Sequence, residues 1–169
     1  GGIIWDVNFG KYYNDMGYAI KETNDGGFIV AGYTDVYSTE NTYMWLVRLD
    51  SNGTFLWEKV ISYEGYSIAT DIITHDDGSF IIGGQTDSLK NDELDFWAIK
   101  TDFIGNIIWS HIYRSSSNNT WKMVADYGGG FTALGTTTHM SQESGDFLLI
   151  HGDTNGKVVW SKTYGGPNF

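Results

Sequence analysis

The feature that most constrains the fold is a string that recurs along the chain and ends in a tryptophan. Trp5, Trp57, Trp109 and Trp160 are separated by 52, 52 and 51 residues. Self-similarity at a fixed period of this size indicates a repeat architecture, in which one supersecondary unit is copied along the chain. Each tryptophan lies in a short apolar and β-branched run, of which residues 3–9 are the first, and such runs are typical of strands. We therefore expect a leading strand followed by three complete units.

A second repeated feature is a turn between two strand-like runs. In the first unit the string D-G-G occupies residues 25–27, in the middle of residues 17–34. Asp-Gly is a strong hairpin signal because glycine adopts the positive φ of the turn at little steric cost. Residues 77–79 and 128–130 are the counterparts in the second and third units. Each of these turns predicts a hairpin of the first and second strands.

The third strand-like run of each unit ends in an aspartate, and a glycine follows three residues later. An aspartate side chain can accept hydrogen bonds from the backbone N–H groups of its own turn, while glycine takes the left-handed conformation. We expect this turn to connect the third strand to the tryptophan strand. The pairs are Asp50 and Gly53, Asp102 and Gly105, and Asp153 and Gly156.

Each unit is thus expected to be a four-stranded antiparallel meander of about fifty residues, the pattern of a propeller blade. The predicted fold class is all-β and of the β-propeller type, in a single repeat domain of residues 1–169. The leading strand is expected at residues 3–9, and the blades at residues 16–61, 67–113 and 121–164. A β-trefoil or β-prism, which also repeats four strands three times, is the structural alternative.

A glycine also recurs inside the second strand of each unit, at Gly32, Gly84 and Gly135. Glycine in a strand interior often marks a place where another backbone comes close. We therefore expect neighbouring units to pack at these three positions.

The composition excludes several classes of function. Ten Lys and Arg against 21 Asp and Glu give a net charge of −11, which would repel a phosphate backbone, so nucleic acid is not an expected partner. The absence of Cys excludes disulfides, Cys-based zinc sites and thiol nucleophiles. No apolar run approaches the about 18 residues that a membrane-spanning helix needs. We expect no membrane span.

The strings D-G-G-F-I-x-A-G-x-T and W-L-V-x-L-D-x-N-G-x-x-x-W, at residues 25–34 and 45–57, resemble the tandem Trp-containing β-propeller repeats of large secreted or surface proteins of archaea and bacteria. They are similar in kind to quinoprotein-type and WD-type propellers. The resemblance implies a propeller fold and an extracellular or cell-surface location. It implies no single function, because propellers include enzymes, lectins and scaffolds. The quinone-binding and catalytic residues of quinoprotein dehydrogenases have no counterpart in the sequence.

The repeats depart from one another at a few positions. The third unit has Gly128 in place of the first turn's aspartate and Leu148 in place of the third strand's tryptophan. The second unit has Phe103 and Ile104 where the first has serine and asparagine.

Three units are fewer than the four to eight blades with which propellers close. We therefore expect the chain to complete a ring with copies of itself, or to be part of a longer array. Two copies of three units would give a ring of six blades. The expected partners are thus the chain itself or further repeats, with a glycan or a surface protein as a further candidate.

In a meander blade the repeated turns fall on one side and the variable loops on the other, and loops on a rigid scaffold commonly carry function. Aromatic residues of these variable loops could stack on a sugar or on a partner's side chain. The predicted ligand-binding residues are Tyr12, Tyr13, Tyr37, Tyr63 and Trp121.

The same loops contain many carboxylates. Two of them about 5 to 9 Å apart would suit glycoside hydrolysis, and several together would suit calcium, although a solvated acidic rim is the simpler explanation. These residues are Asp15, Asp35, Glu40, Glu64, Asp87, Asp92, Glu93, Glu143 and Asp146.

The predicted function is that of a non-enzymatic extracellular or cell-surface repeat module, which acts as a structural or binding scaffold. The alternatives are a carbohydrate-binding propeller and a glycoside hydrolase that uses loop carboxylates. We predict no catalytic residue, metal ligand or cofactor. The four His lack paired metal-ligand spacing, no Gly-rich string precedes a helix, and no Ser lies in a nucleophile elbow.

Overall fold

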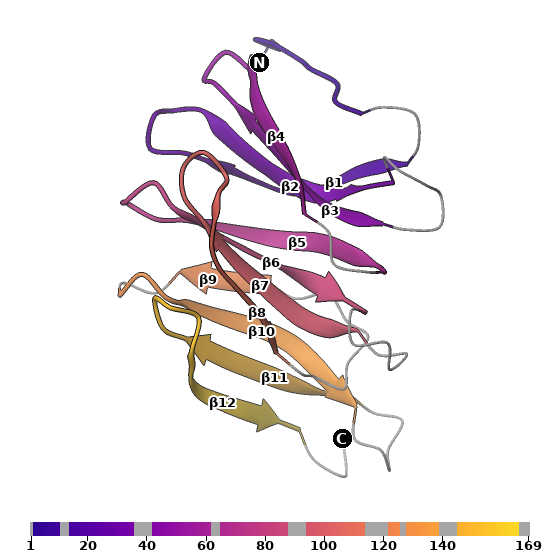
Figure 1. Cartoon of the computed structure of the whole chain (residues 1–169), viewed down its shortest axis with the longest axis vertical. Helices are drawn as coiled ribbons and strands as arrows, with labels where there is room; N and C mark the ends of the chain where they lie inside the picture. The colour runs from indigo at the N-terminus through magenta and orange to yellow at the C-terminus, as the bar shows by residue number, and fades with distance from the viewer. Residues whose placement is uncertain are drawn as a thin grey trace.

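The computed structural model describes residues 2–10, 14–35, 42–61, 65–87, 94–113, 122–125, 128–138 and 145–165. Within these residues the protein is all-β, and its strands form three four-stranded antiparallel sheets stacked along the long axis of the molecule (Figure 1). The first sheet contains β1 (Asp15–Glu22), β2 (Phe28–Thr34), β3 (Tyr43–Leu49) and β4 (Phe55–Ile61). The second contains β5 (Ser67–Thr74), β6 (Phe80–Thr86), β7 (Asp95–Thr101) and β8 (Ile107–Tyr113). The third contains β9 (Lys122–Ala125), β10 (Phe131–Thr138), β11 (Gly145–Gly152) and β12 (Val158–Tyr164).

Each repeat forms its own sheet. The strands follow chain order from β1 to β4, from β5 to β8 and from β9 to β12, and every neighbouring pair within a sheet is antiparallel. The described strands therefore build three separate meanders, as in the blades of a propeller, and they close into no barrel. The predicted all-β class of four-stranded meanders is confirmed.

Residues 3–9 form no strand, which corrects the expectation of a leading strand. The fourth strand of each sheet pairs with the third strand of the same sheet, as β4 does with β3, and the described chain contains no third strand of a preceding unit for residues 3–9. The segment of residues 2–10 instead lies over the first sheet. There Phe9 packs against the cluster of Trp45, Val47 and Leu49.

Two hydrophobic clusters of the described residues lie between the sheets, and a third lies on the outer face of the first sheet. Successive side chains of a strand point to opposite faces of the sheet, and in the second sheet both faces are buried. The adjacent residues Ile81 and Ile82 of β6 are both fully buried, but Ile82 packs with residues of the first sheet and Ile81 with residues of the third. Each central sheet thus needs a neighbour on both of its faces.

The recurring glycine Gly32 lies against a strand of its own sheet. A Cβ atom at this position would overlap the carbonyl oxygen of Met16 in β1. The register between β1 and β2 shifts between Gly17 and Ala19, which identifies a β-bulge there. The bulge brings the β1 backbone so close that only glycine fits opposite it.

The second sheet repeats this arrangement, which corrects our interpretation of the glycines. A Cβ atom at Gly84 would overlap the carbonyl oxygen of Ile68 in β5, again beside a register shift. The glycine that packs against the neighbouring sheet is Gly83, one residue earlier. A Cβ atom added there would lie 2.5 Å from the sulfur of Met123 in β9. Gly32 and Gly84 are therefore bulge positions and not contacts between units.

We predict that Gly32→Ala destabilises the fold by about 1–3 kcal/mol, because the added methyl group overlaps backbone that cannot move without disrupting the bulge. Chemical denaturation measures this loss. Gly17→Ala is the matched control in the paired strand, since its Cβ would lie 3.5 Å from a Val30 methyl group, an ordinary contact. Equal stability of the two variants would contradict the assigned role of Gly32.

Candidate functional site

The five aromatic residues predicted to bind a ligand lie outside the described residues, so this binding surface stays a prediction. They are Tyr12, Tyr13, Tyr37, Tyr63 and Trp121. Five of the nine acidic loop residues also lie outside the described ranges, namely Glu40, Glu64, Asp92, Glu93 and Glu143.

Two of the described acidic residues hold the ends of strands together. The carboxylate of Asp35, after β2, accepts hydrogen bonds from Asn14 Nδ2 at 3.2 Å and Thr42 Oγ1 at 3.1 Å. In the second sheet the carboxylate of Asp87 accepts a hydrogen bond of 2.6 Å from the backbone N–H of Tyr66. In both sheets the carboxylate after the second strand thus binds the residue that precedes the first strand, and Asp35 also binds Thr42, which precedes β3.

The turns between third and fourth strands have the predicted chemistry. Asp50 Oδ1 accepts hydrogen bonds of 2.8 Å from the backbone N–H groups of Asn52 and Thr54, and Gly53 has a φ of 78°. The contact with Thr54 is the largest cause of the lowered pKa of Asp50. Asp102 and Asp153 accept equivalent pairs of hydrogen bonds in the other two sheets.

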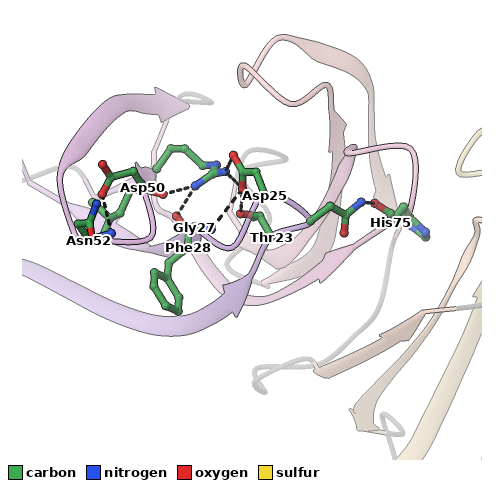
Figure 2. A network of polar contacts seen from close by, with 10 residues as sticks. Thr23, Asp25, Gly27, Phe28, Asp50, Asn52 and His75 are labelled. Atoms are coloured by element: carbon green, nitrogen blue, oxygen red, sulfur yellow. Dashed lines mark hydrogen bonds and ion pairs between the residues drawn. The ribbon is translucent and has the colours of Figure 1, made fainter. Parts of the chain in front are cut away.

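A polar network joins the two turns of the first sheet (Figure 2). The buried guanidinium of Arg48 in β3 donates from Nη2 to both oxygens of Asp25, at 2.5 and 2.7 Å, and from Nη1 to the carbonyl oxygens of Phe28 and Leu49. Thr23 Oγ1 donates to the same carboxylate at 2.6 Å. These contacts lower the pKa of Asp25 from 3.8 to about 2, and the hydrogen bond from Thr23 has the largest effect. Gly27 and Arg48 lower the pKa further, whereas burial raises it.

A pocket of about 210 Å³ lies beside this network, between the first and second sheets. Its lining residues are Thr23, Asn24, Asp25, Arg48, Thr74, His75, Gly78, Phe80 and Phe103. Ligand pockets usually measure about 300–1,000 Å³, so this one is small. Both terminal nitrogens of Arg48 already bind protein oxygens, and Asp25 is ionised at neutral pH. The arrangement is suited to holding two turns and two sheets together, which Asn24 Nδ2 also does through the carbonyl oxygens of His75 and Asp76.

The other sheets vary the Arg48–Asp25 pair in a consistent way. In the second sheet Lys100 replaces the arginine and lies close enough to Asp77 to help lower its pKa, after the larger effect of two hydrogen bonds from Ser79. In the third sheet Gly128 occupies the position of the aspartate, and His151 occupies that of the arginine. His151 stacks on Trp160 with ring centroids 5.1 Å apart. The acidic and the basic partner are lost together.

The described ranges contain no group of three His, Asp or Glu residues that could hold a metal ion. No helix in this part of the chain is long and apolar enough to cross a membrane.

A contact between successive repeats recurs at each turn that follows a third strand. The tryptophan of one unit lies against the turn glycine of the next. A Cβ atom added at Gly105 would lie 3.1 Å from Trp57, and a Cβ atom added at Gly156 would lie 3.0 Å from Trp109. Trp5 makes the same contact, 2.6 Å from a Cβ atom at Gly53, although its segment is not a strand. The repeated tryptophans therefore lie between consecutive units.

Hydrogen bonds strengthen this contact between the second and third sheets. Trp109 Nε1 donates a hydrogen bond to the carbonyl oxygen of Thr154 at 2.9 Å. The hydroxyl of Tyr113 donates one to the carbonyl oxygen of Gly156 at 2.5 Å. Burial raises the pKa of Tyr113, so its hydroxyl stays protonated and keeps donating. The fourth strand of one sheet is thus fixed to the turn of the next.

The outward face of the third sheet exposes large apolar side chains. We call it the end face, defined by Leu134, Phe147 and Leu149. Phe147 is 61% exposed, whereas the equivalent Met44 and Phe96 of the first two sheets are 0% exposed. Leu134 lies directly opposite Leu149 in the register and is 42% exposed. These positions are covered by the next sheet in the first two units, and the described residues form no fourth sheet to cover them in the third.

No model of a known protein family matches the sequence, and no curated protein matches it. The resemblance to Trp-containing propeller repeats therefore stays a prediction.

The end face was not among the sites predicted from the sequence, although a signal for it exists. The third strands carry consecutive apolar residues, as from Phe147 to Ile150, so that both faces of the strand are apolar. This pattern predicts a sheet that is buried on both sides. In a stack, the outermost sheets must then leave one such face uncovered.

We predict that the stabilising effect of Asp25 disappears in acid. Because its pKa is lower in the folded protein than its ordinary value of 3.8, its contribution is complete above that value and is lost as the pH falls towards about 2. The free energy of unfolding of the wild type should thus exceed that of Asp25→Asn by a constant amount above about pH 5, and the difference should shrink as the pH approaches 2. Urea denaturation across this range measures it.

Thr23→Val provides a further test, because it removes the hydrogen bond with the largest effect on this carboxylate. The pKa of Asp25, followed by NMR, should rise in the variant. An Asp25 that titrates at its ordinary value in the wild type would contradict the described network.

Proposed function

We propose that the chain is a non-enzymatic repeat scaffold whose function is assembly, in which the end face of the third sheet binds a second copy of the chain. The observation that carries this proposal is the exposure of Phe147, at a position that is fully buried in both preceding sheets. Large apolar residues exposed together commonly mark sites of protein association.

A second copy is the occupant that the internal interfaces favour. The first sheet packs on the second, and the second on the third, through the same positions of the repeat, which include Leu46 and Ala98. Leu149 is the equivalent residue of the end face. A sheet of the same repeat, supplied by another copy, would continue this interface with chemistry that the chain already uses twice.

The chemistry of the described turn side supports a scaffold rather than a catalyst. The charged groups beside its pocket are bound to each other, since Arg48 pairs with Asp25 and both also bind groups of the turns. The carboxylate stays ionised at neutral pH and would serve poorly as a general acid. These groups stabilise the turns that present the sheets to one another.

The proposed location, outside the cell or on its surface, follows from the resemblance to secreted and surface propeller repeats. Association of two copies would bring six sheets together, within the range of four to eight blades in known propellers. The proposed assembly is therefore a ring of two chains.

We predict that Phe147→Asp weakens self-association at least about tenfold, because a charge would be buried without a partner in the new interface. Sedimentation equilibrium over a range of concentrations measures the dissociation constant. Circular dichroism checks the fold, which should persist because Phe147 is exposed in the single chain.

Phe103→Asp is the matched control. Phe103 is 66% exposed, about as much as Phe147, but it lies at the tip of the turn between β7 and β8 and not on the end face. Its substitution should leave the dissociation constant unchanged. Equal effects of the two substitutions, or a wild type that stays monomeric at all concentrations, would refute the proposal.

A further inference from the structure

We infer that residues 2–10 are a displaceable cap on the first sheet, and that the end face of a second copy binds the first sheet in place of this cap. The inference rests on the proposed self-association and adds the receiving surface. It identifies a head-to-tail interface between two different faces of the same chain.

The cap occupies the place of a preceding sheet. Trp5 lies on the glycine of the Asp50 turn, as Trp57 and Trp109 lie on the turns that follow them. Its ring also meets Phe28 edge to face, with centroids 5.6 Å apart. Residues 2–10 thus reproduce, without forming a strand, a contact that otherwise joins two complete sheets.

The cap fills this place incompletely. A pocket of about 260 Å³ remains between Val7, Asn8 and Phe9 of the cap and the residues of the sheet beneath. The residues of the sheet that line it are Met16, Gly17, Val30, Ala31, Gly32, Trp45 and Val47. In the interior of the stack, by contrast, the equivalent residues are covered by a whole neighbouring sheet.

The first strand shows the same deficiency. Met16 and Ile20 of β1 are 47% and 57% exposed, whereas the equivalent residues of β5, Ile68 and Ile72, are buried. Packing defects and exposed apolar groups both forgo favourable contacts. A complete sheet would cover β1 and fill the pocket, which a segment of nine residues does not.

The cap and the second copy compete for one site. Trp160 of β12 corresponds to Trp5 in the repeat, and the two have the same exposed fraction, 37%. When the third sheet of one chain continues the stack onto the first sheet of another, its Trp160 takes the position on Gly53 that Trp5 occupies in the single chain. The cap must leave before the copy can bind, so it raises the apparent dissociation constant.

The test compares cap variants of the whole 169-residue chain by sedimentation equilibrium. Trp5→Ala weakens the cap and should lower the apparent dissociation constant at least about fivefold. Ile4→Ala is the control, since Ile4 is 94% exposed, and it should change the constant less than about twofold. In hydrogen exchange, the amides of residues 2–10 should exchange faster in the assembled protein than in the monomer.

A synthetic peptide with the sequence of residues 2–10 gives a test that does not depend on the folding of a variant. Added in excess to the Trp5→Ala protein, it should occupy the first sheet and return the protein to the monomer. The same peptide with alanine in place of tryptophan should have little effect.

The outcomes separate the two proposals. If Phe147→Asp abolishes association but Trp5→Ala leaves association unchanged or weaker, the proposed role of the cap is wrong. The docking role of the end face then stands. If the wild type stays monomeric at all concentrations, the proposed function fails, and the cap fails with it. Stronger association of Trp5→Ala that the peptide reverses supports both.

Discussion

The structure depends on the contact between the tryptophan of one repeat and the turn glycine of the next. The turn requires glycine because its φ is positive, as in Gly53, Gly105 and Gly156. The missing side chain leaves a flat surface on which the indole of the preceding unit rests. One residue type thus serves both the local turn and the packing between units. Because Trp5, Trp57 and Trp109 each reach the turn of the next repeat, the sheets stack in chain order.

The stack also explains why burial is so uneven among equivalent residues. In repeat proteins each unit contacts only its neighbours, so stability is gained at the interfaces between units. The first strand of the middle sheet, β5, is buried at seven of its eight residues, whereas the equivalent strand β1 of the first sheet is exposed at six of eight. The difference follows from position in the stack, because the three repeats share the same apolar pattern.

The sequence predicts best those features whose causes are local. The turns at Asp25 and Asp50 follow from side-chain and backbone chemistry within a few residues, and the structure confirms them. Residues 3–9 resemble the fourth strands but form no strand, because a strand also needs a partner, which lies outside its own sequence. Gly32 was assigned to the wrong neighbour for a similar reason, since the bulge beside it is a property of two paired strands. The end face could be identified only after the order of the sheets was known.

The two ends of the stack differ, and this difference determines what kind of assembly the proposal allows. One end has an intramolecular cover in residues 2–10, and the other exposes Phe147. Contacts between unlike faces continue indefinitely unless the rotation between successive copies closes a ring. A cap that binds its own first sheet adds the same cost to every such contact, in an open chain and in a ring alike, because each contact must displace one cap. The cap therefore raises the concentration at which copies associate, whichever of the two assemblies they form, and it protects the single chain at low concentration.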